Sequence, residues 1–186
     1  MAAAYCVNFG SQDVEALYLA APVGLAPWKL SADTMVRKAL ASLVWDLGVT
    51  PQGLLRSLGS YGRRLWGDLG ERSRYRGLDA ACWEYLGHAQ MLPGSGDVAF
   101  MRLLTRSGWG DPLLESLSSV TAPTRIIYGE DDYVRHEFGP IAVHALSSSP
   151  GADHVVIPDV GHHLYWDQHQ AFSDHIISFH RHLQNS

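Results

Sequence analysis

The sequence has few cysteines and no excess of basic residues. Its two cysteines, Cys6 and Cys82, are too few for a disulfide scaffold, and both lie in apolar, helix-like segments where we expect buried thiols. The formal net charge of −5 argues against a general nucleic-acid binder, because neutralising phosphates requires a basic surface. No apolar run reaches the roughly 18 residues that a membrane-spanning helix needs. A secretory signal is also lacking, which predicts a cytoplasmic or organelle-associated protein that is not secreted.

The start of the chain has the pattern of an α/β core segment. Residues 2–9 predict a helix with no capping residue before it, so we expect this helix to begin before Met1. Residues 14–20 form a short apolar run between turn residues and predict a strand buried on both faces. We assign residues 1–27 to this first core segment.

The middle of the chain, residues 28–110, is rich in arginine, glycine and aromatic residues and shows no strand pattern. Helix-like stretches are predicted at residues 33–45, 51–58 and 78–86. A helical excursion of this length between two buried strands predicts a cap or lid domain.

The sheet pattern returns in residues 111–186. Strands are predicted at 124–128 and 154–157, and helices follow them at 138–146 and 168–183. Strands that alternate with helices in this way form βαβ units, which have parallel strands and right-handed crossovers. Together with the first strand, they predict an α/β fold with about three parallel strands and flanking helices.

Each of the two later strands runs into a turn that carries a reactive side chain. Residues 129–132 read Gly-Glu-Asp-Asp, and the second strand is followed by Gly161 and His162. Parallel strands present their carboxyl ends at one edge of the sheet, so a carboxylate and an imidazole should meet there. A carboxylate in that position accepts the Nδ1–H of the imidazole and prepares Nε2 to take a proton.

These turns resemble the acid turn and the catalytic-histidine turn of the α/β-hydrolases. The resemblance implies that Asp132 is the acid and His162 the base of a Ser-His-Asp triad, in the order that this superfamily requires. It also implies that the chain is the C-terminal part of such a fold, without a cofactor. The alternative is that Asp131 and Asp132 form only a solvated turn.

A narrower resemblance covers most of the chain. Its segments are residues 1–5, 17–24, 92–100, 108–109 and 162–168. They are similar to the α/β-hydrolase-domain lipid enzymes, which include N-acyl-phospholipid lipases, cardiolipin deacylases and the lipid-droplet coactivator of triglyceride lipase. This similarity implies a phospholipid or acylglycerol substrate and a peripheral contact with a membrane or lipid droplet.

Within that subfamily, a histidine with an aspartate five positions later is linked to lysophosphatidic acid acyltransferase activity. His162 and Asp167 have this spacing. The alternative is that Asp167 simply caps a helix that starts near Gln168.

The sequence contains no Gly-x-Ser-x-Gly nucleophile elbow. Ser11, Ser60 and Ser95 each lack at least one of the two glycines that the motif requires. By resemblance, the elbow would lie upstream of Met1, so we expect a truncated chain that is inactive alone. The rivals are a non-catalytic lipid-binding or scaffold protein that keeps the pair as a relic, and a truncated product without a function of its own.

Arginines gather among aromatic residues in one part of the expected cap. The candidates for contact with a lipid headgroup are Arg63, Arg64, Arg72 and Arg74. The alternative is a solvated face with ordinary ion pairs, and the glycines at 62, 67, 70 and 77 argue against a long amphipathic helix here. The ten histidines form no recognisable metal motif, and we expect no metal site.

Overall fold

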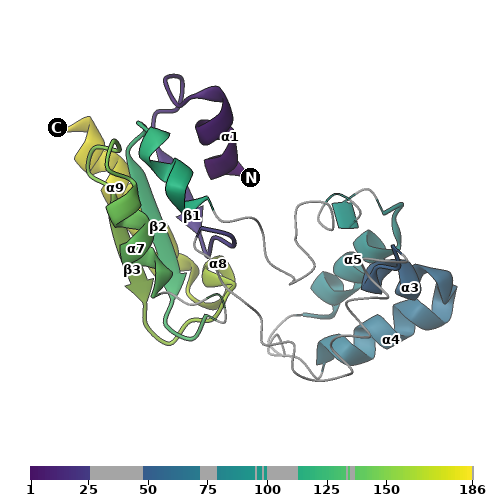
Figure 1. Ribbon diagram of the computed structural model, residues 1–186. Coiled ribbons are helices and arrows are strands. Elements are labelled where there is room, and N and C mark those ends of the chain that lie inside the picture. Colours follow the sequence, from purple (N-terminus) through teal and green to yellow (C-terminus); the bar gives the residue numbers. More distant parts are fainter. Residues whose placement is uncertain are drawn as a thin grey trace. The chain divides into compact units, whose positions relative to one another are not determined.

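The computed structural model describes residues 1–25, 48–71, 79–94, 96–97, 99, 113–132, 134 and 137–185. The chain divides into two units. Figure 1 shows both, with colours that follow the residue number. One unit combines residues 1–28 with 111–186, and the other comprises residues 29–110. The predicted helix at 33–45 lies outside the described residues.

The first unit is built on a parallel sheet with the strand order β1-β2-β3. The strands are β1 (Leu17–Ala20), β2 (Thr124–Gly129) and β3 (Asp153–Ile157). In the register, Leu19 pairs with Ile126. Strand β2 lies between the other two, so Ile126 has no exposed surface, as expected for an apolar residue of a central strand. The predicted parallel sheet is confirmed.

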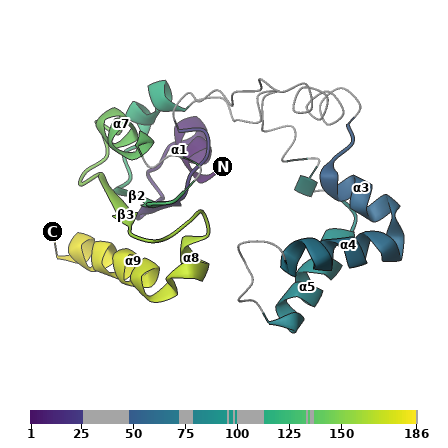
Figure 2. The same cartoon turned by 90° about the horizontal axis from the view of Figure 1, so that it is seen from below.

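Helices cover both faces of the sheet (Figure 2). Helices α1 (Ala2–Phe9) and α7 (Phe138–Ala145) lie on one face, and α9 (His169–Gln184) lies on the other. The long helix α9 packs through Phe179, whose ring centroid is 5.6 Å from that of Tyr18 on β1.

Arg125 of β2 fixes α9 and β3 to the centre of the sheet. Its guanidinium pairs with the carboxylate of Asp153 on β3 and lies 4.5 Å from the ring centroid of Phe179. It also donates to the backbone carbonyl of His175 at 2.7 Å. One side chain therefore links three elements.

Strand β1 begins at Leu17, three residues later than the sequence predicts. The Val14 amide donates to the Ser11 carbonyl at 3.0 Å, which keeps this part of the chain in a turn. The Ser11 hydroxyl in addition accepts from the amides of Thr121 and Ala122, at 2.9 and 3.2 Å. These contacts between distant parts of the sequence replace pairing in the sheet.

The chain leaves and re-enters the sheet unit at neighbouring points. The Leu113 amide donates to the Gly24 carbonyl at 3.0 Å. A short 3₁₀ helix, η1 (Leu114–Ser119), follows directly and was not predicted. Residues 29–110 are thus inserted between two backbone segments that are hydrogen-bonded to each other.

The second unit contains the helices α3 (Pro51–Ser57), α4 (Gly59–Glu71) and α5 (Ala80–Met91), and no strand occurs among its described residues. Thr50 and Asp79 cap α3 and α5, each accepting a backbone amide at 2.8 Å. Both helices therefore begin at a residue type that favours helix starts.

Two sequence predictions fail in this unit. Helix α4 runs through Gly62 and Gly67, although the glycines argue against a long amphipathic helix here. Gly62 is needed there for packing, since a Cβ at this residue would lie only 1.9 Å from the Leu55 carbonyl oxygen of α3. Cys82 is exposed rather than buried, while Cys6 is buried as predicted. Cys82 lies in the first turn of α5, where its position along the helix, and not its residue type, decides its exposure.

Candidate active site

The turns that follow β2 and β3 are bonded directly to each other. The Glu130 amide donates to the Ile157 carbonyl at 3.0 Å, and the Asp131 amide donates to the Val160 carbonyl at 2.9 Å. A Cβ at Gly129 would lie 2.2 Å from the Val160 carbonyl oxygen, so only glycine allows this approach. The backbone of the second turn is therefore fixed against the first.

Asp132 and His162 meet between these turns. The Asp132 Oδ1 lies 3.0 Å from the His162 Nδ1. The Asp132 side chain has 0% of its surface exposed and that of His162 has 20%. The solvated-turn alternative therefore describes Asp131, which is exposed, and not Asp132.

The surroundings of Asp132 keep its carboxylate in one orientation. The same Oδ1 accepts the Val134 amide at 2.9 Å. Oδ2 is buried, and among the described residues it has no hydrogen-bond partner. An ionised carboxylate accepts hydrogen bonds only, so His162 donates its Nδ1–H to it, and in the neutral ring Nε2 then carries the lone pair.

Two further aromatic side chains belong to this region. The Tyr128 hydroxyl donates to the Pro22 carbonyl at 2.9 Å, and burial, followed by the charge of Asp132, raises the pKa of this phenol. The His163 Nδ1 lies 2.9 Å from the Tyr165 hydroxyl. Burial, followed by the neighbouring His162 ring, lowers the pKa of His163 against the opposing charges of two carboxylates. Both groups therefore favour their neutral forms.

Asp167 does not cap the following helix. It is the last residue of a short helix, α8 (Leu164–Asp167), and α9 begins after Gln168 without a side-chain cap. The Asp167 Oδ2 instead accepts the Gly161 amide at 3.1 Å. The capping alternative is wrong, because the aspartate faces back toward the histidine turn.

The serines rejected on their flanking residues have other places in the structure. Ser11 is buried, and its hydroxyl is 2.7 Å from that of Thr121 in addition to its two backbone bonds. Ser60 lies on α4 in the helical unit, and Ser95 lies outside the described residues.

Of the four candidate headgroup arginines, the structure describes two. Arg63 and Arg64 are exposed on α4, whereas Arg72 and Arg74 lie outside the described residues. Exposure leaves Arg63 and Arg64 accessible to solvent.

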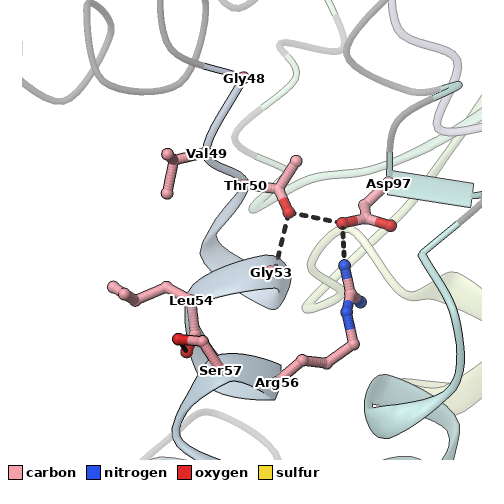
Figure 3. A pocket seen from close by; sticks show the side chains of 8 residues that line it. All are labelled: Gly48, Val49, Thr50, Gly53, Leu54, Arg56, Ser57 and Asp97. Atoms are coloured by element: carbon pink, nitrogen blue, oxygen red, sulfur yellow. Dashed lines mark hydrogen bonds and ion pairs between the residues drawn. The ribbon is translucent and has the colours of Figure 1, made fainter.

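A cluster that the sequence did not reveal lies in the helical unit (Figure 3). The Asp97 Oδ2 accepts from the Thr50 hydroxyl at 2.5 Å and from the Arg56 guanidinium at 2.6 Å. The Thr50 bond, followed by that of Arg56, lowers the pKa of Asp97. These side chains line a cavity of about 390 Å³ with Gly48 and Leu54. Helix periodicity gives no signal for this contact, because its partners are more than 40 residues apart.

Neither a metal centre nor a bilayer-spanning helix is found in the part of the chain that the structure describes. No three side chains among its His, Cys, Asp and Glu residues are arranged to hold a metal ion. None of its helices combines the length and the apolar character needed to cross a membrane.

Comparisons with known proteins agree with this architecture. No protein-family profile matches the chain. Over 149 residues it is 25% identical to a 1-acylglycerol-3-phosphate O-acyltransferase of Arabidopsis thaliana, which covers 75% of this chain and 35% of the relative. An esterase from Exiguobacterium antarcticum superposes with a TM-score of 0.62 at 18% identity, covering 97% of this chain and 62% of that chain.

A second solved structure, a bacterial membrane phospholipase A, superposes with a TM-score of 0.59 at 19% identity, covering 100% of this chain and 54% of that chain. The chain thus spans about a third of the length of the plant relative and less than two thirds of each solved structure. Like these solved structures, it carries parallel strands with helices on both faces. The chain therefore has the α/β-hydrolase fold, as the resemblance in the sequence implies.

Proposed function

We propose that the chain is the acid-and-histidine part of a lipid-directed serine hydrolase or acyltransferase. The observation that carries the proposal is the 3.0 Å contact between Asp132 Oδ1 and His162 Nδ1. In this arrangement Asp132 holds the imidazole in the tautomer whose Nε2 accepts a proton from a serine hydroxyl. It then stabilises the imidazolium that forms.

In this proposal the serine comes from a Gly-x-Ser-x-Gly elbow that these 186 residues do not contain. During acyl transfer, His162 takes the proton of the attacking serine and later gives it to the leaving group. It then activates water for hydrolysis or a lysophospholipid hydroxyl for transfer. Without the serine and its oxyanion hole, little of the rate enhancement is left, and we expect no turnover from the chain alone.

The proposed substrate class is a phospholipid or an acylglycerol. The acyltransferase name of the plant relative and the phospholipase name of one solved structure support it. The exposed Arg63 and Arg64 suit phosphate oxygens and would assist a peripheral contact with a membrane or lipid droplet.

A fluorophosphonate probe, which labels activated serines, tests the proposal. We expect no labelling of the purified chain and strong labelling of a form extended upstream by a segment with the elbow. In the extended form, His162→Gln should reduce labelling by roughly a thousandfold or more. His169→Gln, at an exposed histidine of α9, is the matched control and should have no effect. An extended form that stays unlabelled would contradict the triad assignment.

A second candidate is a non-catalytic lipid-binding protein that retains the pair. The lack of an elbow in the sequence favours it. This candidate predicts that the chain binds phospholipid vesicles and that His162→Ala leaves the binding unchanged. Upstream coding sequence with an elbow, together with labelling of the extended form, would exclude it.

A further inference from the structure

The geometry points to Asp167 as a positioning residue that holds the His162 turn in place through the backbone amide of Gly161. The inference rests on the proposed function, since it concerns how the histidine of that site is oriented. It assigns Asp167 a role that depends on hydrogen-bond acceptance and not on a charge acting on the substrate.

The turn before the histidine is held from the end of α8 by two consecutive side chains. The Asp167 Oδ2 accepts the Gly161 amide at 3.1 Å, and the Gln168 side-chain amide donates to the Pro158 carbonyl at 3.2 Å. Helix α8 follows the histidine directly, and the Asp167 amide donates to the carbonyl of its N-cap residue, His163, at 3.1 Å. The segment from Pro158 to Gln168 therefore forms a closed loop with His162 inside it.

This loop needs such a link because the turn that carries Asp132 holds its backbone as far as Val160, before His162 is reached. Asp159 has a φ of 55°, in the left-handed region that aspartate tolerates better than most residues other than glycine. His162 follows directly after Gly161, which has no side chain to restrict it. A functional side chain must stay within about 0.5 Å of its productive position, so an unfixed turn would separate His162 from Asp132.

If Asp167 positions the turn, a neutral hydrogen-bond acceptor can replace its carboxylate. If its charge is needed, a neutral acceptor cannot. The carboxylate that contacts the His162 Nδ1 belongs to Asp132, whereas the Asp167 Oδ2 accepts a backbone amide. An asparagine oxygen also accepts a backbone amide but carries no charge. Asp167→Asn should therefore preserve the arrangement, and Asp167→Ala should lose it.

The experiment measures the imidazole tautomer of His162 in the full chain by ¹⁵N NMR at alkaline pH, where imidazoles are neutral. Nitrogen shifts distinguish a protonated ring nitrogen from a bare one, and His162→Gln identifies the signal. In the wild-type chain we expect the Nδ1–H tautomer to predominate. Asp132→Ala, the positive control, should abolish this preference.

We expect Asp167→Ala to lose most of the Nδ1–H preference and Asp167→Asn to keep it. If both variants behave like the wild type, or if Asp167→Asn loses the preference as fully as Asp167→Ala, the inference is overturned. A wild-type chain without the Nδ1–H tautomer would instead contradict the proposed function. The two failures are thus distinguishable.

Hydrogen exchange of the Gly161 amide keeps the inference testable if Asp167→Ala does not fold. In the wild-type chain and in Asp167→Asn, this amide should exchange roughly tenfold more slowly than an unstructured amide, as expected for one added hydrogen bond. Exchange at the unprotected rate in the wild-type chain would overturn the inference.

Discussion

At the α carbon of Gly129, the turn that carries Asp132 touches the turn that carries His162. The neighbouring atoms belong to the backbone of Val160 and Gly161, which cannot rotate away as a side chain could. A methyl group there must displace one turn relative to the other.

We therefore expect Gly129→Ala to lower the free energy of unfolding by about 1–3 kcal/mol, as is usual when a close-packed site is overfilled. Urea denaturation measures the change. Gly96→Ala is the matched control, because nothing lies within 4 Å of a Cβ at that residue. Equal stabilities of the two variants would show that the turns are not in contact.

His163 predicts a pH dependence of stability. Its pKa is lowered in the folded chain, chiefly by burial and then by His162, so the unfolded chain binds the proton more readily. The contribution of His163 to the free energy of unfolding is constant above about pH 6.5, the ordinary histidine pKa. Below that value, the free energy of unfolding falls as the pH drops. Asp132, Asp167 and Tyr165 also face this ring or act on its charge.

Chemical denaturation between neutral and mildly acidic pH tests this prediction in the wild type and in His163→Gln. The difference between the two pH profiles isolates His163, since the other titrating groups are common to both chains. We expect the variant to lose less stability in acid. If the stability of the variant falls as steeply with pH as that of the wild type, a group other than His163 causes the loss of stability in acid.

At the residue scale, the sequence predicts those site residues that a local sequence pattern marks. Asp132 and His162 each follow an apolar strand and a glycine, and the parallel topology then brings the two turns together. The bond from Asp167 to the Gly161 amide has no such pattern. It depends on the exact path of the turn, which side-chain identities do not specify.

At the scale of elements, the Asp97 cluster ties the start of α3 to a segment beyond α5. Its carboxylate accepts from Thr50, whose hydroxyl also caps α3, and from Arg56 in the last turn of that helix. Only 10% of the Asp97 side chain is exposed. Loss of the carboxylate should therefore weaken the helical unit as a whole.

We expect Asp97→Asn to destabilise the helical unit by about 2 kcal/mol at neutral pH, the range for a hydrogen bond to a charged group. Because the pKa of Asp97 is lowered, its contribution is present above about pH 4 and is lost as the pH falls through the folded-state pKa. Thermal unfolding followed by circular dichroism should thus show a smaller difference from the wild type in acid. Glu84→Gln, at an exposed carboxylate of α5, is the control.

The sequence predicts best those helices and strands whose bounds depend on their own residues and not on distant contacts. Strands β2 and β3 are apolar runs between turn residues, and their bounds agree with the prediction within one residue. Helix α4 could not be predicted, because glycines are unfavourable in an isolated helix, and the packing of Gly62 against α3 is not visible in the sequence. The start of β1 likewise depends on the Ser11 hydroxyl reaching residues 121 and 122.

On the scale of the whole molecule, β1 and β2 are neighbours in the sheet although residues 29–110 separate them in sequence. The bond between the Leu113 amide and the Gly24 carbonyl joins the two ends of that insertion. A short linker could therefore replace the insertion without stretching the sheet unit.

We expect replacement of residues 29–110 by a flexible linker of about ten residues to lower the entropic cost of pairing β1 with β2 by about 1 kcal/mol. The folding rate should rise roughly fivefold, while the unfolding rate should stay nearly unchanged. Stopped-flow refolding measures both rates. A shortened chain that does not unfold cooperatively would show that the sheet unit needs the inserted helices.

The same long separation has a consequence during synthesis. Strand β1 leaves the ribosome roughly a hundred residues before β2 does, which at 5–20 residues per second is a delay of about 5–20 seconds. The helices of the insertion have close sequence neighbours as partners and can form during that interval, whereas β1 cannot. For those seconds β1 lacks its neighbour β2, and this is where we expect chaperones to act on the nascent chain.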